Sequence, residues 1–174
     1  MLPYDPAWHI LFKQEAQQLA QIFSAEIVAI HHIGSTSIPG IPAKPIIIIM
    51  PVVQDIQRIE GYNAVMLENG YVARGEFGIP GRRFFIKGGD EHRSHHLHIF
   101  QVGNPEIERH LAFRDYMIAH PQEAQAYGAL KESLARQYPF DMDGYVNGKD
   151  QFIKDIDRKA RVWCESLQLN RPDI

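Results

Sequence analysis

The nine-residue run Pro45–Val53, "PIIIIMPVV", constrains the fold of this chain more than any other stretch. It is apolar at every position, contains two prolines, and is about half as long as a membrane-spanning helix. A short run without polar alternation is typical of a strand that is buried on both faces. The sequence therefore predicts a central, doubly covered strand over Pro45–Met50, which we expect Pro51 to end.

The segments around this run predict both helices and strands. Asp5 and Pro6 form a helix-start signal. The expected helices span Ala7–Phe23, Asp55–Asn69, Pro105–Ala119, Gln122–Gln137 and about 145–167, and the expected strands lie at Glu26–Ile33 and within 71–76, 82–89 and 95–102. A helix, then mixed strands, then a helical C-terminal third is an α+β pattern, and residues 1–174 are the size of a single domain.

Composition excludes several classes of protein. The net charge of −3 provides no basic field for generic nucleic-acid binding. Cys164 is the only cysteine, so neither an intrachain disulfide nor a cysteine-rich zinc site can form. The N-terminal residues lack a basic segment followed by an apolar core, and no apolar run has the length of a membrane span. We expect a cytoplasmic protein without a membrane segment.

The Gly34–Ser35 turn is the first candidate binding element. Gly34 allows the backbone to approach a ligand closely, and the following N–H groups can form an anion-binding nest. Ser35, Thr36 and Ser37 add three hydroxyl groups, and Lys44 at the far end of the loop can supply a positive charge to a phosphate. The alternative is an ordinary surface turn with a solvated lysine.

Two histidines on one predicted strand are the second candidate. Side chains alternate along a strand, so His96 and His98 share one face while His95 and Leu97 share the other. Imidazoles in this arrangement can bind a metal, donate to a phosphate, or perform acid–base chemistry near pH 7. The alternative is one partly buried histidine and one exposed histidine.

Several cationic residues are candidate charge partners for a bound anion. One residue of the pair Arg82 and Arg83 must point to the same sheet face as the histidines, and we assign Arg83 to the site. Arg114 and Lys149 complete the set. Each of these residues is equally compatible with a solvated surface charge.

Six sequence blocks carry a resemblance to a known family. They are "HHIGSTSIPGIPAKPII", "FFIKGG", "HRSHHLHIF", "ERHLAFRDYMIAHP", "YGALKESLA" and "GYVNGKDQFI", in that order. Together they resemble the GrpB family, which is placed in the nucleotidyltransferase superfamily, from about Tyr4 to Lys159. The resemblance implies a short mixed sheet flanked by helices, in which a Gly-Ser turn after the first strand holds a nucleotide triphosphate.

The resemblance also implies metal chemistry that this sequence does not fully match. In the superfamily, acidic residues on the next strand bind two Mg²⁺ ions. Gly34 and Ser35 match the turn, and Lys44 matches the "AKPII" block, but Ile48 stands where the family usually has Asp. His96 and His98 lie where other members of the superfamily carry a further acid. No nearby carboxylate replaces the missing one, so Mg²⁺ or Mn²⁺ binding is in doubt.

Three hypotheses follow from the sequence. The first is a protein that binds a nucleotide or another phosphorylated small molecule without two-metal transfer. The second is an active nucleotidyl- or phosphotransfer enzyme that uses His96 and His98 in metal ligation or acid–base chemistry. The third is a non-catalytic interaction module. Under the first, we expect an anion near Ser35, Lys44 and His98, bound more tightly as the histidines gain charge between pH 8 and 6.

Overall fold

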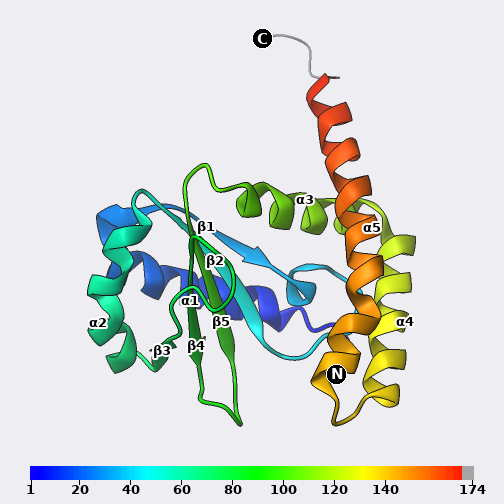
Figure 1. The fold of residues 1–174 in the computed structure, drawn as a ribbon, viewed down its shortest axis with the longest axis horizontal. Coiled ribbons are helices and arrows are strands. Elements are labelled where there is room, and N and C mark those ends of the chain that lie inside the picture. The colour runs from blue at the N-terminus through cyan, green and yellow to red at the C-terminus, as the bar shows by residue number, and fades with distance from the viewer. Residues whose placement is uncertain (170–174) are drawn as a thin grey trace.

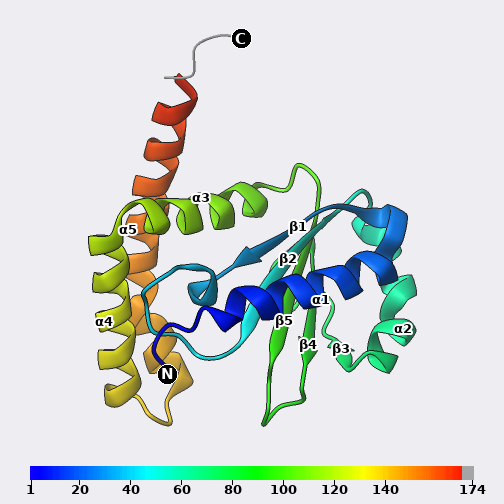
Figure 2. The ribbon, with the colours of Figure 1, turned by 180° about the vertical axis from the view of Figure 1, so that it is seen from behind.

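A computed structural model describes residues 1–169 and shows a five-stranded mixed sheet with helices on both faces (Figures 1 and 2). The strands are β1 (Ile27–Ile33), β2 (Ile47–Val53), β3 (Tyr71–Ala73), β4 (Arg82–Lys87) and β5 (His95–Gln101). The helices are α1 (Ala7–Phe23), α2 (Asn63–Glu68), α3 (Pro105–Ala119), α4 (Pro121–Gln137) and α5 (Met142–Leu169). The strand order is β1-β2-β5-β4-β3, in which only β2 and β5 are parallel. The predicted α+β class, with a short mixed sheet and a helical C-terminal third, is confirmed.

Strand β2 lies between β1 and β5 and is covered on both faces, as its apolar run predicts. Ile47 and Ile49 pack in the core beneath α1, which crosses one face of the sheet in Figure 2. Met50 packs on the opposite face in a cluster that includes Ile107 from α3. The prediction that Pro51 ends the strand is wrong, because β2 continues to Val53.

Proline is accommodated in this central strand by a local interruption of the sheet. The pairing of β2 with β5 passes from Ile49–Leu97 to Val52–Phe100, so Met50 and Pro51 have no register partner on β5. A proline has no N–H to donate to a ladder, and an irregular position is where a sheet tolerates one.

The predicted helix over Asp55–Asn69 is shorter and less regular than expected. Residues Ile56–Tyr62 form a 3₁₀ segment, and only α2 is α-helical. Gly61 lies at the junction, where its lack of a side chain weakens an α-helix. The Asp55 carboxylate accepts a hydrogen bond from the Gln57 N–H and caps the segment.

The three C-terminal helices pack against one another beside the sheet, and α5 extends beyond the rest of the molecule (Figure 1). Their shared core includes Ile38 and Ile41 from the loop between β1 and β2. This packing brings the Gly34–Ser35 turn against α4 and α5. No helix within residues 1–169 is both long enough and apolar enough to cross a membrane.

Candidate functional site

A cavity of about 280 Å³ lies where the turn after β1 meets the start of β2 and the helices α4 and α5. Its polar lining consists of Ser35, Thr36, Lys44, Arg93, His96, Lys131, Tyr145 and Lys149, and its apolar lining consists of Met1, Ala43, Ile46, Ile48, Met142 and Val146. The structure therefore brings together five of the predicted site residues: Ser35, Thr36, Lys44, His96 and Lys149.

The charges that line this cavity are all positive. Lys44, Arg93, Lys131 and Lys149 carry four cationic side chains, and none of the lining residues within the described chain is Asp or Glu. Arg93 has an ion pair outside the cavity, at 3.4 Å from Asp90. A cavity with an excess of one charge favours ligands of the opposite charge, because low-dielectric walls strengthen the field inside it. The lining is thus suited to an anion.

Lys131 is a cavity residue that the sequence reasoning missed. Only 3% of it is exposed, and its Nζ donates to the Ser35 Oγ at 2.8 Å and to the Pro42 carbonyl at 2.7 Å. Burial, followed by repulsion from Lys149, lowers the pKa of Lys131 to about 8. The available signal was its place in the apolar stripe of α4, between Tyr127 and Leu134 at helical spacing.

The ring of Tyr145 lies next to the ammonium groups of Lys44 and Lys149. The Nζ of Lys44 lies 4.9 Å from the centroid of its ring, and the Nζ of Lys149 lies 4.5 Å from it. Burial is the main reason that the pKa of Lys149 is lowered, and the nearby charge of Lys44 adds to the effect. An anion between these ammonium groups would relieve their mutual repulsion.

Gly34 and Ile48 are packed against each other at the base of the cavity. Gly34 has a φ of +73°, and a Cβ built on it would lie 2.9 Å from the Ile48 Cδ1. Glycine is therefore favoured by the backbone conformation, and a larger residue would also displace the end of the Ile48 side chain. Ile48 lies opposite His96 on the neighbouring strand and faces the cavity.

His96 lines the cavity and carries a buried nitrogen without a hydrogen-bond partner. Its Nε2 is buried and has no hydrogen-bond partner in the described structure. Burial, with smaller contributions from Arg93 and His95, lowers the pKa of His96 to about 4. The expectation that this histidine gains charge between pH 8 and 6 is therefore wrong, and its neutral ring can donate or accept one further hydrogen bond.

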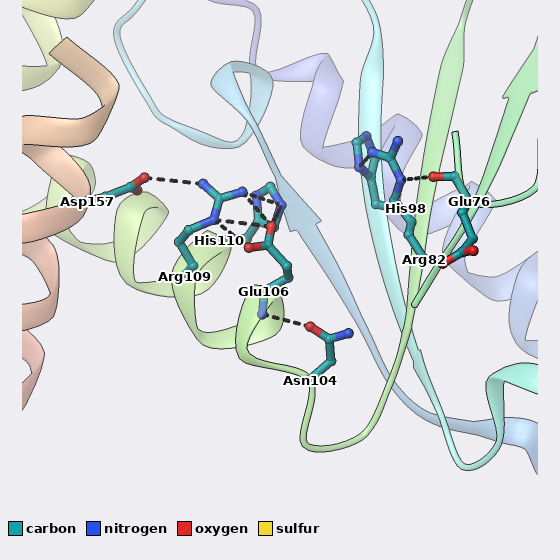
Figure 3. A network of polar contacts seen from close by, with 8 residues as sticks. All are labelled: Glu76, Arg82, His98, Asn104, Glu106, Arg109, His110 and Asp157. Atoms are coloured by element: carbon teal, nitrogen blue, oxygen red, sulfur yellow. Dashed lines mark hydrogen bonds and ion pairs between the residues drawn. The ribbon is translucent and has the colours of Figure 1, made fainter. Parts of the chain in front are cut away.

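His98 shares the sheet face of His96 but belongs to a separate polar network (Figure 3). Its Nδ1 accepts a hydrogen bond from the Arg82 guanidinium at 3.1 Å, and its ring centroid lies 6.0 Å from that of His110. Burial and the neighbouring charges hold the pKa of His98 well below its usual range. Arg82, and not Arg83, is the arginine that points to this face.

The network continues along α3 to α5, as Figure 3 shows. The Arg109 guanidinium lies 2.7 Å from the Glu106 carboxylate and 3.3 Å from that of Asp157, and it also contacts His110. Here the charge of Arg109 is paired with two carboxylates. We call the group in Figure 3 (Glu76, Arg82, His98, Asn104, Glu106, Arg109, His110 and Asp157) the paired network.

Three predicted site residues have polar partners that do not line the cavity. The Arg83 Nε lies 3.2 Å from the Glu60 carboxylate, on the sheet face opposite the histidines. The Arg114 guanidinium donates to the carbonyl oxygen of His32 at 3.1 Å and joins α3 to β1. Thr36 lines the cavity, but its hydroxyl is 2.9 Å from the His32 Nε2.

The cavity residues do not fit a Mg²⁺ or Mn²⁺ ion. Both ions prefer oxygen ligands, principally carboxylates, and the described lining provides no carboxylate. His96 is its only imidazole, because His98 lies in the paired network. Within residues 1–169, no group of three or more His, Cys, Asp or Glu side chains is arranged to hold a metal ion.

Comparison with solved structures supports the fold and its helical C-terminal part. The crystal structure of the conserved protein GrpB from Enterococcus faecalis superposes with a TM-score of 0.88 at 43% sequence identity. The match covers 92% of this chain and 98% of that chain. The arrangement of sheet and helices is therefore shared over nearly the whole of both proteins.

Sequence relatives extend the same comparison. The chain is 48% identical over 160 residues to the UPF0157 protein YqkA of Bacillus subtilis, covering 92% of this chain but 46% of that protein. It thus spans less than half of that relative. It is 34% identical to the glutamate-rich protein GrpB of Alkalihalophilus pseudofirmus, covering 90% and 92% of the two chains.

One further relative carries an enzyme name. A dephospho-CoA kinase of Mycolicibacterium paratuberculosis is 26% identical, with 95% of this chain matching 46% of that protein. The model of the GrpB protein family matches residues 1–159. The chain belongs to the GrpB family.

Proposed function

We propose that the cavity binds the phosphate of a nucleotide or another phosphorylated small molecule, and that it does so without two-metal transfer. The observation that carries this proposal is the charge of the lining. It has four cationic side chains, and none of the described lining residues carries a carboxylate. A phosphate monoester carries between one and two negative charges near pH 7 and accepts several charge-assisted hydrogen bonds. The likeness to the nucleotidyltransferase superfamily supports the same ligand class.

Each polar group has a role in this proposal. Lys131 and Ser35 form one wall of the phosphate site, and Lys44 and Lys149 form the other. His96 supplies a neutral donor through its unsatisfied Nε2. The mycobacterial relative is named for action on dephospho-CoA, which is compatible with a small phosphorylated ligand.

An alternative is an enzyme in which His96 acts as an acid or a base on the bound molecule. The observation that favours it is the same buried and unpaired Nε2. Its lowered pKa makes the neutral ring a weak base, which suits hydrogen bonding better than proton abstraction. His98 does not assist, because its Nδ1 is bonded to Arg82.

The proposal is tested by calorimetric titration of inorganic phosphate at low salt into native protein, Lys149→Met and Lys154→Met. Lys154 lies on the same helix but is exposed and paired with Asp150 at 2.7 Å, so it is the matched control. We expect Lys149→Met to weaken binding by about 10-fold to 100-fold, the loss of one charge-assisted hydrogen bond. Equal affinities in all three proteins would contradict the proposal.

The metal part of the proposal is tested at Ile48. Replacing Ile48 with Asp places one carboxylate among the lysines of the lining, without the second acidic ligand that a divalent ion would need. Titration with Mn²⁺ should leave the melting temperature of this variant and of native protein unchanged. A rise in the native protein would indicate a metal site that the lining does not predict.

A further inference from the structure

The cavity has two chemically different halves, and the second half constrains what the phosphate is attached to. The cationic half contains the lysines and Ser35. The other half is formed by aliphatic side chains: Ala43, Ile46, Ile48, Met142 and Val146. Met142 and Val146 are 62% and 47% exposed, so this half opens toward solvent along one side of α5. A ligand whose phosphate reaches Lys131 can extend out of the cavity along these groups, and the exposed Lys44 and Arg93 border the opening on the cationic side.

The aromatic content of the cavity argues against a stacked nucleobase. Among the described lining residues, Tyr145 is the only one with a phenyl ring, and it is 7% exposed. Its ring already has two ammonium groups next to it, from Lys44 and Lys149. Protein sites that recognise bases generally stack them on accessible aromatic or arginine planes. Tyr145 is not accessible for that purpose, and Arg93, the arginine of the described lining, is engaged with Asp90 at 3.4 Å.

The size of the cavity also argues against a nucleobase. At about 280 Å³ it lies just below the range for small-molecule sites, about 300 to 1,000 Å³. A phosphate group fills the cationic end, and the remaining space suits a slender substituent better than a base and a sugar together.

We infer that the ligand of this cavity is an alkyl phosphate, meaning a phosphate monoester whose ester oxygen bears a flexible aliphatic chain that lies along Ile46, Met142 and Val146. This inference rests on the proposed phosphate site and names the class of its ligand. The four cations hold the dianionic head, and the aliphatic half removes the chain from water. Affinity should therefore rise with chain length, whereas a nucleobase should add nothing.

The test is a calorimetric series of ethyl, butyl and hexyl phosphate, together with ribose 5-phosphate and AMP. Complete burial of a methylene strengthens binding by about fourfold, and the half-open groove should give about twofold per methylene. We expect hexyl phosphate, which has four more methylenes, to bind about 16-fold more tightly than ethyl phosphate, and AMP to bind no more tightly than ribose 5-phosphate.

Two valines of α5 provide a matched pair of variants. Val146→Asn should reduce the gain from ethyl to hexyl phosphate, measured as the ratio of the two affinities in the same variant. Val162→Asn makes the same change at a residue of 59% exposure outside this cavity, and it should keep the full gain.

The outcomes separate this inference from the function on which it rests. Equal affinities across the alkyl series, or AMP binding more tightly than hexyl phosphate, would overturn the alkyl chain while leaving the phosphate site intact. A chain-length gain that survives Val146→Asn in full would also overturn the assigned path. Absence of binding by ethyl phosphate and inorganic phosphate alike would overturn the phosphate site and the alkyl chain together.

Discussion

The cavity and the paired network occupy the same face of the sheet but differ in the partners of their cationic side chains. In the paired network, Arg109 contacts two carboxylates, and Arg82 is tied to His98 and to backbone carbonyls of Glu76 and Phe77. In the cavity, the lysines have hydroxyl, carbonyl and ring partners but no carboxylate within the lining. A satisfied set of charges stabilises a fold, whereas an unsatisfied set is available to a ligand.

The boundary between the two regions passes between His96 and His98. These side chains are two residues apart on β5, and each lies edge-on to the Phe84 ring, at centroid distances of 5.4 and 5.1 Å. Yet the His96 Nε2 is buried without a partner in the described structure, whereas the His98 Nδ1 accepts a hydrogen bond from Arg82. Substitutions in the paired network should therefore change stability, and substitutions in the cavity should change ligand affinity.

The largest effect should come from removing the buried arginine of the paired network. Arg82 is 5% exposed, and Arg82→Met leaves the carbonyls of Glu76 and Phe77 and the His98 Nδ1 without the guanidinium donor. The Glu76 carbonyl keeps the Ile79 N–H as a donor, so two acceptors are orphaned, and we expect the free energy of unfolding to fall by about 2 to 3 kcal/mol, measured in urea. The control Arg74→Met, at an exposed arginine, should change it by less than about 0.5 kcal/mol.

A second effect in the same network should appear in acid. Burial lowers the pKa of His110 to about 4, so the unfolded chain binds a proton on this residue more readily than the folded chain does. Stability should fall as the pH drops from about 6.5 to 4, and this residue should account for about 2 to 3 kcal/mol of the fall. His110→Gln should make the decline shallower.

The surroundings of His110 define the control for this acid effect. Arg109, Glu106, Arg82 and His98 are the charged or titratable groups next to it. The matched variant is His92→Gln, because His92 is exposed in the loop between β4 and β5. If both variants lost stability with the native slope, His110 would not be titrating as a neutral buried group.

In the cavity, the buried lysine should control affinity and leave stability nearly unchanged. Lys131→Met keeps the aliphatic stem but removes the ammonium that donates to Ser35. We expect inorganic phosphate to bind about 10-fold to 100-fold more weakly, with unfolding free energy within about 1 kcal/mol of native. Lys13→Met, at an exposed site on α1, should alter neither quantity. A large loss of stability without a loss of affinity would place Lys131 among structural residues.

The smallest effect concerns alkaline pH. Because the pKa of Lys131 is about 8, this side chain loses its charge as the pH rises through that value. Sulfate, which does not titrate in this range, should bind about 10-fold more weakly at pH 9 than at pH 7 if only the ammonium form binds it. Over the same range, unliganded protein should gain stability from this residue, since the unfolded chain holds the proton more strongly. Lys131→Met should lose most of both trends.

The elements of the fold were largely predictable because their signals are local. Apolar periodicity and caps located α1 and α3, and the unbroken apolar run located β2. Pro51 was misread because tolerance of a proline depends on which neighbour its missing N–H would face, and that is a property of the sheet. Gly61 indicated weakness in the next helix, but whether a 3₁₀ segment replaced it depended on packing beneath β4 and β5.

The site was predictable only in part, because it is assembled from distant segments. Ser35, Lys44 and His96 were identified from motif chemistry, and all three line the cavity. Lys131 was missed because it is 96 residues from its partner Ser35, and only a charged position in an apolar helical stripe marked it. The prediction of Arg83 in place of Arg82 was wrong because neighbouring residues on a strand point to opposite faces of the sheet. An error of one residue therefore selects the wrong face.

The one-signed lining of the cavity also has a consequence for how fast a ligand arrives. The chain as a whole carries a net charge of −3, so an approaching anion is repelled at long range and attracted only near the cavity mouth. At physiological ionic strength, screening over about 8 Å removes most of the distant repulsion while the charges inside the cavity remain effective. Added salt should therefore first reduce the long-range repulsion of the anion and, at higher concentration, weaken its attraction to the cavity. The association rate should pass through a maximum at intermediate ionic strength.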